Sequence, residues 1–362
     1  MYTEEYGIGL RVSIGNKIGY ASTNRLAIKS INELVENALS IARAGKDDPY
    51  WHGLPLPSEY KVPQGIYSID LARIDEETLS EHTRVFLDTL LEDERIVLVY
   101  GDIGVSINST AVVNSNGVAG IEHSTIAFAD VGVVASSGSD VTPLVYDVVA
   151  SRIQMPNMEF FARQLRDTAI AQLKPIKIEP GKLPVILHPL AIEELFTYTL
   201  VDAIKGDSVV RGRSFLAGKE GEKVFSEKLS IIDDLLLNQG WFTGIFDDEG
   251  VPMQKTIIID RGVVKNYLFD HYWGSRYGSE STGNASRISY RTTPVITPTN
   301  LVIKPGDIAN HEILEETKKG LYVMGLQGAH SSNPETGEYS VVATPAWYVE
   351  NGELKPIRGV MI

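Results

Sequence analysis

Hydrophobic and polar positions alternate at the start of the chain and then change to a helical period. Residues 9–14 and, more loosely, 17–21 alternate in a way that predicts two strands. Apolar residues then recur every three or four positions over 31–42, which predicts an amphipathic helix. Ser30 is followed three residues later by Glu33, the spacing of a capping box, so we expect this helix to begin at Ser30.

The same alternation of periods continues through the rest of the first half. Asp75 is placed to cap a second helix that reaches about residue 92, and a third helix is predicted over 158–173. Between these helices, residues 96–147 form alternating or apolar runs punctuated by glycines, with Asn116-Gly117 as a turn signal. This stretch predicts a β-meander.

The second half is predicted to be rich in strands. A short apolar strand is expected near 183–187, and a helix is expected from Pro189 until Gly206 stops it. A hairpin is expected around residues 260–262, and one more helix over about 311–319.

Residues 174–182 are the best candidate for a boundary, because they combine two prolines, a glycine and alternating charge. We therefore expect two domains. Residues 1–176 would form a helix-bearing α/β half and residues 177–362 a β-rich half, which together make an α+β protein.

Composition and charge exclude several classes of protein and partner. The chain has 362 residues, of which 43% are hydrophobic and 22% charged, enough for two cores. No apolar stretch is long enough for a membrane span, and the acidic start at residues 1–5 lacks an apolar signal region, so we expect no membrane contact and a cytoplasmic location. A net charge of −14 argues against nucleic acid as a partner. With no cysteine, disulfides and thiolate metal ligands are excluded.

Motifs for metal, phosphate or nucleophilic chemistry are missing. His188 precedes a predicted helix, but positions three and four residues later are Ala191 and Ile192, which cannot bind zinc. His311-Glu312 has no second histidine at zincin spacing. Neither a G-x-S-x-G elbow nor a Walker A motif occurs. His330 lies in a loop of small residues that could approach a ligand, and it is kept as a candidate.

Two loops are candidates for a cleft or an interface. Asp247, Asp248 and Glu249 form the densest carboxylate group; they could bind a cation or a peptide amine, but capping of backbone amides in a turn is favoured. Residues 281–287, with Thr282, Gly283, Asn284 and Arg287, could present backbone donors to an extended peptide or pack against a neighbouring subunit. The sequence does not decide between these two roles.

Several segments, in this order along the chain, resemble the TldD/PmbA family of proteins linked to a two-subunit metalloprotease. The segments are 114–117, 214–224 with Ser214, 244–252, 256–268, 281–285, 333–340 and 348–353. Each is short, but their order is specific and the resemblance reaches from about Gly7 to the end of the chain. Older names in this family refer to DNA gyrase, although the acidic charge does not support direct DNA contact.

The resemblance implies a role as well as a fold. The catalytic type in this family carries HExxxH on a helix, whereas the corresponding residues here, 192–198, contain no histidine. The chain therefore resembles the TldE/PmbA type, which has no metal or catalytic residues of its own and whose TldD-type partner supplies zinc and the glutamate base. The pair would cleave unfolded, extended peptides, and the chain alone could form a homodimer. A stand-alone peptidase with an unrecognised site and a peptide-binding or scaffolding homodimer stay open as alternatives.

Overall fold

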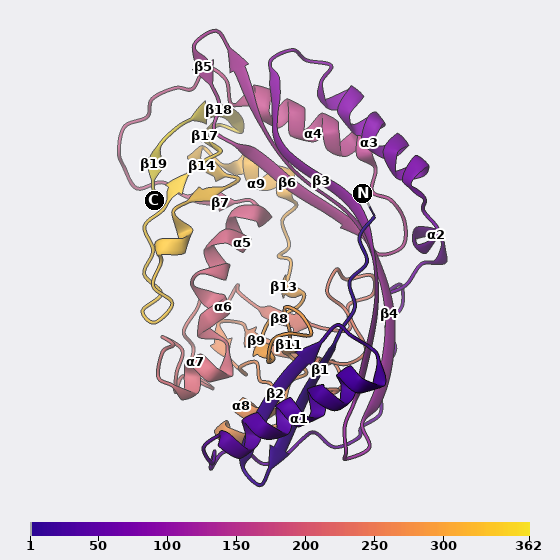
Figure 1. The fold of residues 1–362 in the computed structure, drawn as a ribbon. Coiled ribbons are helices and arrows are strands. Elements are labelled where there is room, and N and C mark those ends of the chain that lie inside the picture. The colour runs from indigo at the N-terminus through magenta and orange to yellow at the C-terminus, as the bar shows by residue number, and fades with distance from the viewer. Residues whose placement is uncertain (1) are drawn as a thin grey trace.

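A long antiparallel sheet is the largest element of the fold. The computed structural model describes residues 2–362, and Figure 1 shows β3 (Ile96–Val113) and β4 (Ala119–Ser137) running side by side along the molecule. β6 (Val145–Ser151) and the short β5 (Asp140–Val141) pair with β4. The predicted β-meander is confirmed, but its strands are much longer than the short runs expected.

Helices α3 (Glu76–Leu90) and α4 (Met158–Ala171) pack on each other and against one end of this sheet. The Asp75 carboxylate accepts the amide of Thr78 at 2.8 Å, so the predicted cap is confirmed. A first core lies between the helices and the sheet, where the rings of Phe86 and Phe161 are 5.7 Å apart. The short α2 (Ile69–Ala72) precedes α3.

The N-terminal hairpin, β1 (Ile8–Ile14) and β2 (Lys17–Thr23), is covered by α1 (Ile28–Ala44). Contact is close because a Cβ on Gly19 would lie 2.0 Å from the carbonyl oxygen of Ala38. The expected start at Ser30 is wrong. The helix begins two residues earlier, after Ala27, whose carbonyl accepts the amide of Ile31 at 3.0 Å, so Ser30 is already inside the first turn.

One sheet of the second half has the strand order β10-β9-β8-β13. It contributes to a second hydrophobic core, which includes Ile231, Ile258 and Leu268. The elements in this region are β8 (Ile231–Asp234), β9 (Lys255–Asp260), β10 (Val263–Val264), β13 (Leu301–Ile303), the pair β11 (Ala285–Ser286) and β12 (Val295–Ile296), α6 (Leu200–Ala203), α7 (Gly206–Val210) and α8 (His271–Tyr277). The hairpin around residues 260–262 is confirmed, with a second strand shorter than expected.

Another sheet of the second half has the order β18-β17-β14-β7, and a three-stranded sheet, β15-β16-β19, shares a core with it. The strands of these two sheets are β7 (Val185–Leu187), β14 (Lys319–Val323), β15 (Leu326–Gln327), β16 (Val342–Ala343), β17 (Ala346–Glu350), β18 (Glu353–Ile357) and β19 (Val360–Met361). The helices of this region are α5 (Pro189–Thr197), α9 (Asn310–Glu316) and the 3-10 turn η1 (Ala329–Ser331). A third core forms around Val323, Ala343 and Ala346.

The helix expected from Pro189 to Gly206 is broken into two pieces, α5 and α6, and a further helix, α7, follows from Gly206. Thr199, with φ −129° and ψ −75°, interrupts it, and the Thr199 hydroxyl donates to the carbonyl of Leu195 at 2.6 Å. Gly206 begins α7 instead of ending a helix. A Cβ there would lie 2.1 Å from the ring of Phe269, so glycine serves close packing at this position.

The mixture of helices with separate sheets confirms the α+β class. Every sheet takes its strands from one side of residue 176, although Ile176 itself bridges to Ile357. The division into domains 1–176 and 177–362 stays a prediction. In the part of the chain that the structure describes, no helix is both long and apolar enough to cross a membrane.

Candidate functional site

The acidic loop at 247–249 is a turn whose first carboxylate holds backbone amides. Asp247 is buried, and its carboxylate accepts the amides of Glu249 and Val251 at 2.9 Å and of Ala285 at 3.1 Å. Burial, and then the neighbouring charge of Glu249, raises the pKa of Asp247 well above its usual value. The capping interpretation of this residue therefore agrees with the geometry.

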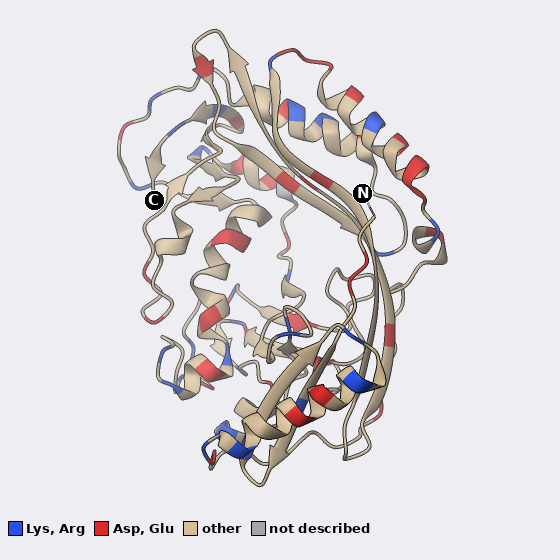
Figure 2. Cartoon of the chain, in the orientation of Figure 1, with Lys and Arg blue, Asp and Glu red and all other residues tan. Residues whose placement is uncertain are grey.

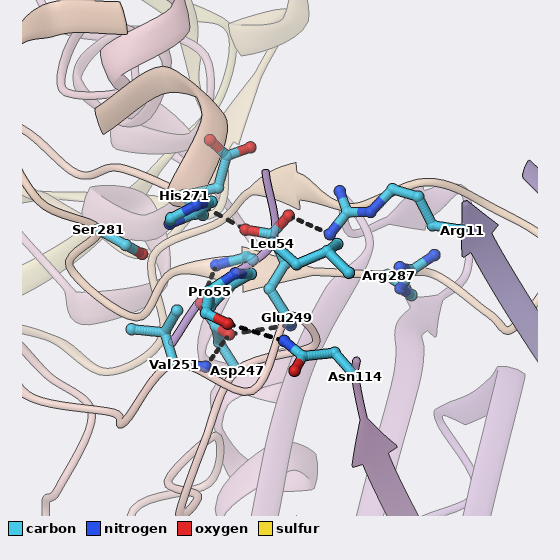
Figure 3. A network of polar contacts seen from close by, with 12 residues as sticks. Arg11, Leu54, Pro55, Asn114, Asp247, Glu249, Val251, His271, Ser281 and Arg287 are labelled. Carbon is cyan, nitrogen blue, oxygen red and sulfur yellow. Dashed lines mark hydrogen bonds and ion pairs between the residues drawn. The ribbon is translucent and has the colours of Figure 1, made fainter. Parts of the chain in front are cut away.

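Glu249 ties the turn to two distant segments. Arg11 Nη2 on β1 lies 2.6 Å from Glu249 Oε1, and the amide of His271 donates to Oε2 at 2.9 Å. Figure 3 shows these groups approaching the carboxylate from two sides. The Glu249 side chain is only 1% exposed, so its carboxylate and the Arg11 guanidinium form an ion pair inside the protein.

Asp248 joins the acidic turn to the second candidate loop. Its amide donates to the carbonyl of Ala285 at 3.0 Å, and its carboxylate accepts the amide of Arg287 at 2.6 Å. The Arg287 guanidinium then lies 5.1 Å above the ring of Tyr20 on β2. Gly283, with φ 76°, allows the two loops to touch, because a Cβ there would lie 2.6 Å from the carbonyl oxygen of Pro252.

Asn284 occupies the buried centre of this second loop. Its Nδ2 donates to Asp233 Oδ2 at 2.7 Å and to the carbonyl of Thr297 at 3.0 Å, while its Oδ1 accepts the hydroxyl of Thr282 at 2.7 Å. Burial raises the pKa of Asp233. Seven of the nine candidate residues thus belong to one network, namely Asp247, Asp248, Glu249, Thr282, Gly283, Asn284 and Arg287.

Ser214 and His330 lie outside that network. The Ser214 hydroxyl donates to the carbonyl of Ala203 at 2.6 Å and accepts the amide of Leu216 at 3.0 Å, so this buried side chain secures its own loop. His330 is exposed in η1, with its ring 6.4 Å from that of Tyr198.

His330 lines a pocket of about 210 Å³ against α5. The lining residues are Glu193, Glu194, Thr197, Tyr198, Leu326, Gly328, Ala329 and His330. Glu194 is engaged on both oxygens, because the Tyr146 hydroxyl donates to Oε1 at 2.6 Å and the amide of Leu326 donates to Oε2. Burial raises the pKa values of Glu194 and Tyr146. This carboxylate is a structural acceptor that links α5 to β6 and β15.

The residues around α5 do not fit a zinc site. His188 Nδ1 accepts the amide of Leu190 at 3.3 Å, and no second histidine follows within α5. Both Glu194 oxygens are taken, as described above. Across residues 2–362, no three His, Cys, Asp or Glu side chains form a group that could hold a metal ion.

Sequence reasoning missed two parts of these surroundings. Arg11 gave no signal, because its partner is 238 positions away. A second pocket, of about 400 Å³, is lined by residues 237–242 together with Thr299 and Asn300, and includes Trp241 and Phe242. Two adjacent aromatics next to a glycine could have suggested an exposed loop of this kind.

Comparison with known proteins gives the family. The profile described as the PmbA/TldA metallopeptidase C-terminal domain matches residues 180–362, and the one described as PmbA/TldA metallopeptidase domain 1 matches residues 2–42. The chain is 32% identical to an uncharacterized protein of Methanocaldococcus jannaschii, over 98% of this chain and 80% of that protein. It is 25% identical to a metalloprotease of the same organism, over 97% of this chain and 78% of that protein.

A crystal structure of TldE from Thermococcus kodakarensis superposes with a TM-score of 0.90 at 32% identity, over 96% of this chain and 78% of that one. The fold and the C-terminal match define a protein built on the metallopeptidase architecture of these relatives. The chain belongs to the PmbA/TldD family.

Proposed function

We propose that this chain is the TldE/PmbA-type subunit of a cytoplasmic two-subunit zinc metallopeptidase that degrades unfolded peptides. A TldD-type partner with an HExxxH helix would hold the zinc and supply the glutamate base. This chain would close the chamber, stabilise its partner and help to admit extended peptide. The similarity to the protein named TldE supports this assignment.

The observation that carries the proposal is the chemistry of α5. By its resemblance to the family, α5 would stand in the place of the metal helix. It carries Glu193 and Glu194 but no histidine, and the Glu194 carboxylate accepts hydrogen bonds from Tyr146 and Leu326. A catalytic zinc needs three protein ligands and an open position for water. With its carboxylate committed to internal hydrogen bonds, this helix is suited to support and not to hydrolysis.

The network around Asp247 and Asn284 supports an architectural role for the family loops. Its side chains bond to one another and to backbone amides, so they fix the shape of the surface that they underlie. We propose that this shaped surface faces the partner or the chamber.

The test is reconstitution with a purified TldD-type chain. We expect both chains to elute together on size exclusion, and an unfolded fluorogenic peptide to be cleaved only by the mixture. Chelator should abolish cleavage and zinc should restore it. Glu194→Gln should leave kcat unchanged, whereas replacing the HExxxH glutamate of the partner should abolish it. Asn284→Ala and Arg287→Ala should lower the activity of the mixture.

Other results would favour the alternatives. Cleavage by this chain alone that survives chelator would support a stand-alone peptidase. A lone chain that binds peptide as a homodimer, with no complex and no gain of activity on mixing, would support a scaffold. A partner that cleaves equally well without this chain would contradict the subunit role.

A further inference from the structure

Two aromatic side chains stand exposed in the larger of the two pockets. Trp241 is 39% exposed and Phe242 is 62% exposed, and both line the pocket of about 400 Å³ together with Leu237. Exposed rings forgo the free energy that burial of apolar surface provides. Pockets of about 300 to 1,000 Å³ with aromatic walls and a few polar groups are typical of sites that bind small ligands.

Buried polar groups hold the loop that carries the two rings. Arg152 is only 7% exposed, and its guanidinium donates to the carbonyl of Gly240 at 3.2 Å and to that of Thr243 at 2.8 Å. The side chain of Asn300 accepts the amide of Phe242 at 3.2 Å and donates to the hydroxyl of Thr243 at 2.9 Å. The backbone on both sides of the rings is therefore fixed before a ligand arrives, which lowers the entropy cost of binding.

Gln239 supplies a free polar group at this pocket. Its φ of 58° is left-handed, a conformation that is rare for a residue with a side chain and that concentrates at ligand sites. The backbone amide of Gln239 donates to the carbonyl of Gln64 at 3.1 Å, and its side-chain stem lies against Gly65, where a Cβ would be 2.6 Å from Gln239 Cγ. Within residues 2–362 the exposed side-chain amide has no hydrogen-bond partner, so it can both donate to and accept from a peptide group.

The lining of this pocket carries no charge. Segment 235–246 contains neither Asp, Glu, Lys nor Arg, although the chain as a whole has a net charge of −14. The remaining lining residues, Thr299 and Asn300, are also neutral. Figure 2 shows charged residues along helices α1, α3 and α4 instead. A charged side chain would lose its water in this pocket without gaining a partner, so the site is complementary to a neutral, apolar one.

We propose that this pocket is a subsite for one large apolar side chain of an extended peptide, with the Gln239 side chain bonding to the peptide backbone beside it. The use of this subsite rests on the proposed function, in which the chain helps to admit unfolded peptide. Large apolar side chains are mostly buried in folded proteins and become accessible when a chain unfolds. The subsite would therefore favour unfolded segments over folded proteins.

The test measures binding of capped peptides to the lone chain. Each peptide is acetylated and amidated and carries one variable residue between glycines, which is phenylalanine, alanine, lysine or glutamate. We expect the phenylalanine peptide to change the tryptophan fluorescence and to bind at least ~10-fold more tightly than the other three, because its ring buries the most apolar surface. Trp241→Phe keeps an aromatic wall and should remove most of the fluorescence change, while calorimetry still detects binding.

Two alanine substitutions of exposed phenylalanines give a matched comparison. Phe242→Ala should raise the dissociation constant of the phenylalanine peptide at least ~10-fold, because it removes half of the aromatic wall. Phe160→Ala is the control, since Phe160 is 55% exposed on α4 and lines neither pocket. Both variants should keep the wild-type melting temperature, so that a difference in binding does not reflect loss of folding. Gln239→Ala should also weaken binding, because the peptide backbone would lose its partner.

Several results would overturn the proposal. They are no saturable binding of the phenylalanine peptide, equal affinity for all four peptides, or equal affinity of the wild type and Phe242→Ala. If these rings instead contact a TldD-type chain, Phe242→Ala would weaken the complex and leave peptide binding unchanged, which also contradicts the subsite. Selective peptide binding without any gain of cleavage on mixing with the partner would support the subsite and contradict the subunit role, so the two failures are distinguishable.

Discussion

Arg11 and Glu249 form a buried ion pair, with Nη2 and Oε1 2.6 Å apart, that fastens the first strand of the chain to a turn in its second half. Their side chains are 13% and 1% exposed. Removing one partner of a buried pair leaves an uncompensated charge. We therefore expect Arg11→Ala to lower the free energy of unfolding by about 3 kcal/mol, measured by urea denaturation. Arg84, whose ion pairs with Glu81 and Asp88 are mostly exposed, is the control, and Arg84→Ala should change stability little.

Asp270 gives a prediction about pH. Burial, and then the charge of Glu249, raises its pKa to about 7, while its carboxylate caps α8 by accepting the amide of Trp273 at 2.7 Å. A raised pKa in the folded state contributes stability at low pH that is lost as pH rises through about 7. Asp270→Asn keeps an N-cap acceptor but cannot ionise. We expect the variant to be more stable than wild type at pH 8, with the difference shrinking toward pH 5. Equal pH dependence of the two melting temperatures would contradict this.

Asn284 predicts a second effect of pH. In Asn284→Asp, a carboxylate would replace the amide that donates to Asp233 at 2.7 Å. Two adjacent buried carboxylates share a proton, so the pKa of the pair rises and stability is lost as pH rises. We expect marked destabilisation at pH 8 that recovers on acidification, measured by thermal unfolding at several pH values. Asn238→Asp alters an exposed amide and serves as the control. Similar pH profiles for both variants would argue against this role of Asn284.

Gly19 tests the close contact between α1 and the N-terminal hairpin. In Gly19→Ala the new Cβ would lie 2.0 Å from the carbonyl oxygen of Ala38 and 2.6 Å from the amide nitrogen of Ala42, so the helix must move. Overpacking of this kind costs about 1–3 kcal/mol. Gly181→Ala is the matched control, since no atom lies within 4 Å of the position that its new Cβ would take. A loss of stability no larger than in the control would mean that α1 shifts away from the hairpin at little cost in free energy.

Regular elements with strong local signals could be predicted from the sequence. Asp75 caps α3 as expected, and the apolar stripe that begins at Met158 forms α4. Local signals were misleading where tertiary contacts decided the outcome. Ser30 is a good capping residue that lies inside α1, and Gly206 starts a helix because Phe269 leaves no room for a side chain.

The sequence allowed the candidate residues to be predicted as a group. It did not allow their contacts to be predicted. The dense carboxylates at 247–249 suggested capping, and Asp247 does accept backbone amides. Arg11 as the partner of Glu249, and Tyr146 as that of Glu194, join segments that no local pattern relates. Such pairings depend on how sheets and loops meet in space.

The N-terminal hairpin also places a constraint on the order of folding during synthesis. The ion pair of Arg11 can form only after Glu249, 238 positions later, has been synthesised. Likewise, the Tyr20 hydroxyl donates to the carbonyl of Tyr290, which is synthesised 270 positions later. At about 5–20 residues per second, the first of these delays lasts about 12 to 48 s on the ribosome. During that time the hairpin and α1 lack the surface on which they finally rest. The beginning of this chain is thus among the last parts to reach its final place.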